Sequence, residues 1–301
     1  MSYYTERHGL RTPVAFTESM TLEMYQTIFD CCEKYFKNIA YLYPEECPDG
    51  NGCCGLDNNK FSCAMTFEIP DLYKNQYGVV SKPERNYYDT PSFDQYALLD
   101  LIELIYDKMK DIKSEWWHSF HRHYDLSFAD TWNTKTVYRN EINQIFKKTG
   151  LLYELSTNGM VERVILNGTL TKEIENNVSQ INEKGTKELL DEAIILFKQP
   201  NPLSRNDAVE KIWDALERLK TYYTSLDKKS SVNKIVFDMA NTQKEFIELF
   251  NTEFKALTDI GNNFRIRHHE TNKIDITDTK HCDYFFNRCL SLIALAIQYL
   301  H

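Results

Sequence analysis

The sequence is poor in residues that break regular structure, and it has no long apolar run. Of its 301 residues only 10 are glycine and 8 are proline, whereas 19 are tyrosine and 17 are phenylalanine. This composition favours packed helices over a disordered or turn-rich all-β chain. The longest apolar stretch, residues 289–300, contains Ser291 and Gln298 and is shorter than the roughly 20 apolar residues of a membrane span. The opening MSYYTERHGL also lacks a signal-peptide core, so we expect a cytoplasmic protein that does not bind membranes.

The chain also has no excess of positive charge. The formal net charge is -9, which excludes a chain that coats nucleic acid over its whole surface, because phosphate binding depends on Lys and Arg. A nucleic-acid site must therefore be local. The sequence contains no GxGxxG, P-loop, HExxH or GxSxG motif, which removes the common dinucleotide, phosphate-loop, metalloprotease and hydrolase interpretations. We expect no cofactor.

The cysteines show no zinc-binding spacing. Cys47, Cys53, Cys54 and Cys63 could supply four thiolates to zinc, but no CxxC pair is present, and structural zinc sites usually use such short spacings. Without a secretory signal these residues are expected to be reduced thiols. The sequence PDGNGCCGLDNN favours a polar loop that contains free cysteines over a metal site.

A histidine cluster offers a second metal hypothesis. His118, His121 and His123 precede Asp125, and the first two would lie three apart on a helix predicted over residues 115–124, a spacing that can bind metal. The neighbouring Trp116 and Trp117 favour a packed surface helix instead. We therefore predict no bound metal here.

Helical periodicity dominates the rest of the chain. Residues 40–92 form the exception, since they are rich in Pro, Gly, Asn and Asp and predict a long irregular insertion. Gly150 is placed to end a helix, and Asn158-Gly159 predicts a β-hairpin that closes a first domain. Helices are expected over residues 17–39, 92–113, 138–148, 186–198, 206–225, 232–257 and 283–300.

The predicted fold class is mainly α, with two domains. Residues 1–168 form an α+β domain with a terminal β-hairpin, and residues 169–301 form an antiparallel helical bundle. In the bundle Trp213 lies on an apolar stripe and is expected in the core, whereas Glu217, Arg218 and Lys220 are expected on a solvated face.

Two segments of the first domain resemble a known family. Thr5-Glu6-Arg7-His8-Gly9 is similar to the opening of the N-terminal domain of AbiJ-type abortive-infection proteins, and residues 138–164, YRNEINQIFKKTGLLYELSTNGMVERV, resemble its closing unit. The resemblance implies a role in defence against phage. Arg7 and His8 either contact a phosphate or fix the N-terminal segment to the hairpin, and the second interpretation is favoured.

The second domain resembles the HEPN-type helical modules that accompany such domains. Residues 205–223 are similar to the first long helix of these modules, and residues 260–273, IGNNFRIRHHETNK, lie where they place their functional segment. The resemblance implies a homodimer through the bundle and an RNA partner. Active members have an Arg, four to six residues and a His, whereas here Arg265 and His269 have three residues between them.

The candidate catalytic residues are therefore Arg265, Arg267, His268 and His269. Histidine can move protons near neutral pH and guanidinium binds phosphate, as metal-independent RNA cleavage requires. Two alternatives stay open. The RxRHH run can be a solvated turn neutralised by nearby acids such as Glu270, and the bundle can be a degenerate, non-catalytic dimerising adaptor or sensor.

Overall fold

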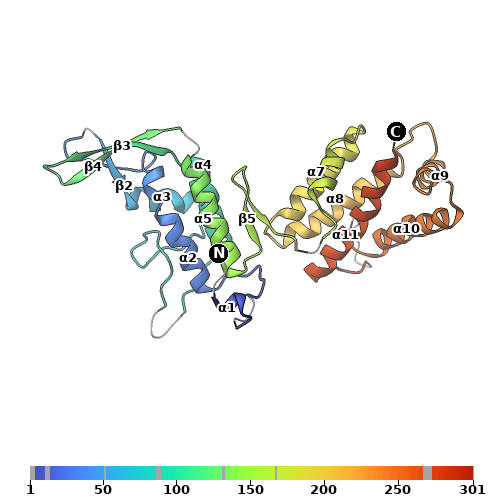
Figure 1. The fold of residues 1–301 in the computed structure, drawn as a ribbon, viewed down its shortest axis with the longest axis horizontal. Helices are drawn as coiled ribbons and strands as arrows, with labels where there is room; N and C mark the ends of the chain where they lie inside the picture. The colour runs from blue at the N-terminus through green and yellow to red at the C-terminus, as the bar shows by residue number, and fades with distance from the viewer. Residues whose placement is uncertain are drawn as a thin grey trace. The chain divides into compact units, whose positions relative to one another are not determined.

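The chain folds into two compact units, Met1–Val164 and Ile165–His301, each with its own apolar core. Figure 1 shows helices in both units and the strands of the first. The prediction of a mainly helical fold with a small β component is confirmed. The structure is a computed structural model that describes residues 4–10, 14–50, 52–85, 90–130, 133–166, 168–266 and 273–300.

Three helices form the centre of the first unit: α2 (Leu22–Glu33), α4 (Gln95–Lys108) and α5 (Asn133–Thr149). Each was expected from its apolar spacing. Thr21 caps α2 by accepting a hydrogen bond from the N–H of Met24. Tyr138 of α5 is fully buried, and its hydroxyl donates to the Ile102 carbonyl of α4. A short α1 (Tyr4–Arg7) precedes them, and η1 (Phe36–Ile39) follows α2.

The stretch expected to be an irregular insertion contains regular elements. Strands β1 (Pro44–Glu46) and β2 (Cys53–Leu56) pair with each other, and α3 (Asn58–Glu68) follows them. Asp57 caps α3 by accepting from two backbone N–H groups. The helix buries only one short apolar face, and its own periodicity is therefore too weak to stand out among polar neighbours.

The predicted helix over residues 115–124 is wrong. The chain instead forms the hairpin of β3 (Asp111–His118) and β4 (His123–Ala129), within a four-stranded sheet of order β1-β2-β4-β3. Trp117 pairs with Tyr124 across the two strands, and their rings lie 4.9 Å apart. Such cross-strand aromatic pairs stabilise a sheet. Helical spacing along the chain does not report a contact of this kind.

The hairpin that ends the first unit is confirmed. Strands β5 (Tyr153–Leu155) and β6 (Val161–Arg163) pair around Gly159, whose φ is +84°. Asn143 of α5 holds the hairpin by donating to and accepting from the backbone of Leu155. Gly150 follows α5 directly with a φ of +77°, as its predicted role in ending a helix requires.

The second unit is built from helices, and its predicted helix over residues 232–257 is broken into two. Asn241 and Thr242 adopt positive φ values of 45° and 66° between α9 and α10, a conformation that no helix can continue through. The run of five polar residues at 241–245 was the available signal for this break, but neither Gly nor Pro lies in it, so the apolar spacing on its two sides was assigned to one helix. The elements are α6 (Lys172–Ser179), α7 (Lys184–Lys198), α8 (Leu203–Leu219), α9 (Lys228–Met239), α10 (Lys244–Asn263), α11 (Thr279–Ala296) and η2 (Ile297–Tyr299).

The core of the second unit centres on α8. Helices α7 and α11 both pack against it, and the rings of Phe197 and Phe286 stack 3.8 Å apart. Trp213 is 1% exposed, which confirms its predicted place in the core. None of the helices in the described ranges combines the length and the apolar character needed to cross a bilayer.

Candidate functional site

The predicted catalytic segment begins where α10 ends. Phe264 terminates the helix and forms a parallel bridge with Ile274. The N–H of Arg265 donates to the Ile274 carbonyl, and the N–H of Ile274 donates to the Asn263 carbonyl. Ile266 is buried in the core of the second unit. Backbone hydrogen bonds and one apolar anchor therefore fix the two ends of the segment next to each other.

Of the four predicted catalytic residues, the structure describes Arg265. Its guanidinium Nη1 lies 2.8 Å from Asp275 Oδ1, across the bridge. Arg265 and Asp275 thus connect the start and the end of the segment through their side chains, in addition to the backbone bonds. Arg267, His268 and His269 lie outside the described residues.

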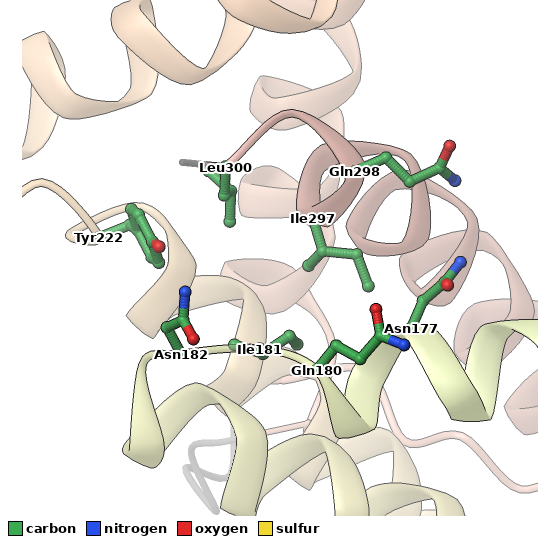
Figure 2. A pocket seen from close by; sticks show the side chains of 8 residues that line it. All are labelled: Asn177, Gln180, Ile181, Asn182, Tyr222, Ile297, Gln298 and Leu300. Atoms are coloured by element: carbon green, nitrogen blue, oxygen red, sulfur yellow. The ribbon is translucent and has the colours of Figure 1, made fainter.

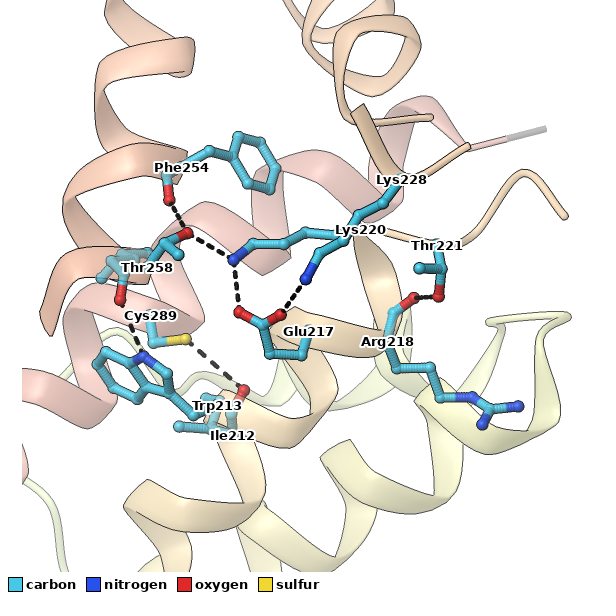
Figure 3. A network of polar contacts seen from close by, with 11 residues as sticks. Ile212, Trp213, Glu217, Arg218, Lys220, Thr221, Lys228, Phe254, Thr258 and Cys289 are labelled. Carbon is cyan, nitrogen blue, oxygen red and sulfur yellow. Dashed lines mark hydrogen bonds and ion pairs between the residues drawn. The ribbon is translucent and has the colours of Figure 1, made fainter. Parts of the chain in front are cut away.

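A buried polar network positions the helix that carries this segment. Lys220, at the end of α8, is 3% exposed, and its Nζ contacts Glu217 and lies 2.6 Å from Thr258 Oγ1 of α10. Trp213 Nε1 donates to the Leu257 carbonyl, also in α10. Figure 3 shows Lys220 and Lys228 meeting at the Glu217 carboxylate. The connection between α8 and α10 therefore consists of polar bonds as well as apolar packing.

This network corrects the solvated face predicted for Glu217, Arg218 and Lys220. Only Arg218 is exposed, and in Figure 3 it points away from the other two. Burial acts to raise the pKa of Glu217, but hydrogen bonds from Lys220 and Lys228 outweigh it and hold the pKa below its usual value. The carboxylate stays charged because two ammonium groups face it, an arrangement that sequence spacing did not indicate.

Arg218 makes a separate ion pair with Glu183. Its guanidinium donates to both carboxylate oxygens, at 2.9 and 2.7 Å. Glu183 also caps α7 by accepting from the N–H groups of Gly185 and Thr186. The Arg218 bond, followed by the contacts from Thr186 and Gly185, holds the pKa of Glu183 well below its usual range. This pair ties the start of α7 to the end of α8.

A pocket of about 250 Å³ opens in the second unit beside the end of α6. Figure 2 shows Gln180, Ile181 and Asn182 facing Ile297 and Leu300 of the C-terminal segment. Among the described residues, its polar groups are amides and one phenol, and none of the described side chains that line it is charged. These side chains offer neutral hydrogen bonds. Its lining residues are Asn177, Gln180, Ile181, Asn182, Tyr222, Ile297, Gln298 and Leu300.

The family-like opening residues lie in and beside α1. The ring of His8 packs 4.4 Å from that of Tyr4. Further along, Thr17 exchanges backbone hydrogen bonds with Gly150 and Leu152 beside the terminal hairpin. Glu18 adds to this attachment, because its carbonyl accepts from the Tyr153 hydroxyl and its carboxylate lies 3.5 Å from Arg163. A phosphate role for Arg7 and His8 stays a prediction. The role of Arg7 and His8 in fixing the N-terminal segment also stays a prediction.

Residues from the two rejected metal hypotheses come together in the first unit. Cys47 Sγ lies 3.5 Å from His118 Nδ1, and Asp49 contacts His118 and His121. Cys53, Cys54 and Cys63 do not join this group. Neither metal hypothesis included Asp49, and sequence spacing does not show that the cysteine loop and the histidine run lie side by side in the fold. The content of Trp, Phe and Tyr in EWWHSFHRHYD, which favours strands, was the available signal for a hairpin.

Comparison with known proteins identifies the first half of the chain. The family described as AbiJ N-terminal domain 4 matches residues 2–180, which include the whole first unit and α6. No curated protein and no solved structure matches the chain significantly. The match includes both segments in which the sequence resembles AbiJ-type proteins, and it ends before α7.

Proposed function

The chain belongs to the AbiJ N-terminal domain 4 family, and from this premise we propose that it is an abortive-infection protein whose second unit acts on RNA. The N-terminal domain suggests the role in phage defence. The second unit, a bundle that we assign to the HEPN type, carries the effector function. Its active segment is residues 265–269, and it works as a metal-independent endoribonuclease.

The closed base of the segment carries this proposal. Phe264 and Ile274 are bridged, and the Arg265–Asp275 ion pair lies across the same junction. The two ends of the segment that contains the basic run are therefore fixed to each other by the bundle, and a chemical site needs such rigid support. A merely solvated turn does not need a backbone bridge and a buried Ile266 at its base.

The ion pair between Arg265 and Asp275 indicates different roles for the four candidate residues. Because its guanidinium already binds Asp275, Arg265 is a positioning residue and does not contact substrate. Arg267 is left to bind a phosphate through its planar guanidinium. His268 and His269 provide the base that takes the ribose 2′-hydroxyl proton and the acid that protonates the leaving oxygen.

The test is cleavage of RNA by the purified full chain, combined with growth of cells that express it. We expect cleavage without added divalent ions and products that end in a 2′,3′-cyclic phosphate. His268→Ala should lower the rate about 100-fold or more, as loss of a general acid or base does. Arg267→Ala should weaken RNA binding and relieve growth inhibition.

Matched substitutions elsewhere control for general damage. His281→Ala changes an exposed histidine at the start of α11, and Arg139→Ala changes an arginine of α5. Both should leave cleavage and growth inhibition unchanged. If all variants cut equally, or if no RNA is cut between pH 5 and 9, the proposed activity is wrong.

A second candidate is a dimerising adaptor, and two observations favour it. Arg265 is already paired with an acid, and α10 exposes Phe246 at 45% and Leu249 at 50%. We propose that this face of α10 contacts a second copy of the chain. Leu249→Asp should then convert a dimer to a monomer in light scattering, whereas Asp259→Asn on the same helix should not. Dimerisation with intact RNA under all conditions would support the adaptor over the nuclease.

A further inference from the structure

The turn between β3 and β4 brings histidines together in the first unit. His118, the last residue of β3, pairs with His123, the first residue of β4. Arg122 closes the turn with a φ of 58°, and its N–H donates to the His118 carbonyl. His121 lies within this turn, and its ring centroid is 4.9 Å from that of His118. The strand geometry therefore gathers three imidazoles at one tip.

The loop between β1 and β2 supplies a thiol and a carboxylate to the same place. Cys47 is 4% exposed, and its N–H donates to the Gly52 carbonyl, which closes the loop. Its Sγ lies 3.5 Å from His118 Nδ1. Asp49 Oδ1 is 2.9 Å from His121 Nε2, and Asp49 Oδ2 is 3.4 Å from His118 Nε2. Two hairpin loops distant in sequence thus meet through groups that all bind metals.

The distances suit one tetrahedral ion. Ligand atoms of Cys47, Asp49, His118 and His121 all lie within 4.8 Å of one another. Bond lengths to zinc place a sulfur and a nitrogen on the same tetrahedral ion about 3.6 Å apart. The Cys47–His118 separation of 3.5 Å already has this value. Ligand atoms of the group that lie up to 4.8 Å apart need to approach one another by about 1 Å to bind the same tetrahedral ion.

A neighbouring buried pair provides an independent indication of a ligand. His123 Nε2 and Asp125 Oδ1 are buried and make no hydrogen bond, although they lie 3.3 Å apart. Ligand atoms of both residues lie within 4.8 Å of one another and of Cys47. Buried polar atoms without partners are rare and require an explanation such as an ion. A cation beside Cys47 would give these two atoms an electrostatic partner.

We propose that Cys47, Asp49, His118 and His121 bind one zinc-type transition-metal ion, with His123 and Asp125 forming its immediate polar surroundings. A thiolate with two imidazoles selects Zn²⁺ or Co²⁺ over Mg²⁺ and Ca²⁺, which prefer oxygen ligands. Asp49 is 51% exposed on its side chain, so the ion has a path from solvent. The ion is structural, because it connects the β1–β2 loop to the β3–β4 hairpin.

The direct test is the metal content of the purified full chain. We expect one zinc ion per chain by elemental mass spectrometry, and a thiolate-to-metal charge-transfer absorption band when Co²⁺ replaces the zinc. Cys47→Ser and His121→Gln should each reduce bound metal by at least tenfold. His123→Gln should weaken binding less, because it removes a neighbour and not a ligand.

Two substitutions of the same type serve as controls. Cys63→Ser changes an exposed cysteine in α3, and His281→Gln changes an exposed histidine of the second unit. Both should keep the full metal content. Equal loss in Cys63→Ser and Cys47→Ser would show adventitious thiol binding and overturn the proposal.

A loss of metal in a variant could also result from misfolding, and an experiment on the wild-type chain separates the two causes. Removing the ion with a chelator should increase amide hydrogen exchange in residues 44–56 and 111–129, and adding Zn²⁺ should restore the protection. Unchanged exchange in both segments, or a chain without metal that takes up neither Zn²⁺ nor Co²⁺, would refute the site. None of these readouts depends on RNA cleavage.

Discussion

Replacing Lys220 with methionine tests whether the buried network fixes α10. The side chain of Lys220 is 4% exposed, and it joins Glu217 of α8 to Thr258 of α10. Methionine keeps most of the buried aliphatic volume and removes the ammonium group. The substitution leaves Glu217 with Lys228 as its remaining partner, at 2.7 Å.

The expected loss follows from what remains around Glu217. Leaving one member of a buried ion pair alone costs about 3–5 kcal/mol. Glu217 keeps Lys228 and is 18% exposed, so part of this cost is avoided and we expect about 2 kcal/mol. That value corresponds to a roughly 30-fold increase in the opening equilibrium of the second unit. Lys228→Met removes a half-exposed partner and should cost less than about 1 kcal/mol.

Amide hydrogen exchange can measure this change in each unit separately. Peptides from α8 and α10 should exchange about 30-fold faster in Lys220→Met, while peptides from α4 and α5 should be unchanged. Adding Glu217→Gln to Lys220→Met should recover part of the loss, because no buried charge is then left with a single partner. Unchanged protection of α10 in Lys220→Met would refute a stabilising role for the network.

Three further predictions concern local conformation and pH. Gly150→Ala should destabilise the first unit by about 3 kcal/mol, because a Cβ would lie 2.5 Å from the Ala15 carbonyl at a φ of +77°. Gly78→Ala, at a φ of +75° in open space, should cost only about 1 kcal/mol in thermal unfolding. Thr242→Gly should stabilise the second unit by about 0.5 kcal/mol, since relief of its positive φ exceeds the added chain entropy; a lower unfolding midpoint in urea would contradict this. The folded pKa of Glu183 lies below the unfolded value, so its contribution is complete above about pH 4.3 and is lost as pH falls. Glu183→Gln should flatten the decline in melting temperature between pH 5 and 3, and an unchanged decline would exclude this pair as the cause.

Local patterns predicted the parts of the fold that depend on neighbours in sequence. The long amphipathic helices, the end of α5 at Gly150 and the hairpin at Gly159 each follow from spacing or from a backbone requirement. Helix α3 and strand β3 were missed because their stability comes from partners that are distant along the chain. Strand pairing is a nonlocal contact, and a test of periodicity has no access to it.

The same limit applies to the sites. The basic segment stood out because its residues are consecutive, but its closure at Phe264 and Ile274 required the fold. Lys220 looked like a surface residue because its carboxylate and hydroxyl partners come from two different helices. The Cys47 and His118 groups were weighed separately for the same reason, since 71 positions in the chain separate them.

The bridge between Phe264 and Ile274 has a consequence for how this protein can change in evolution. Its hydrogen bonds join backbone atoms, so they do not depend on which side chains lie between the two residues. Insertions and deletions after Ile266 therefore leave α10 and α11 in place, because the cost of closing a loop rises slowly with its length. Relatives of this chain should therefore vary in length in this stretch before they vary in the helices.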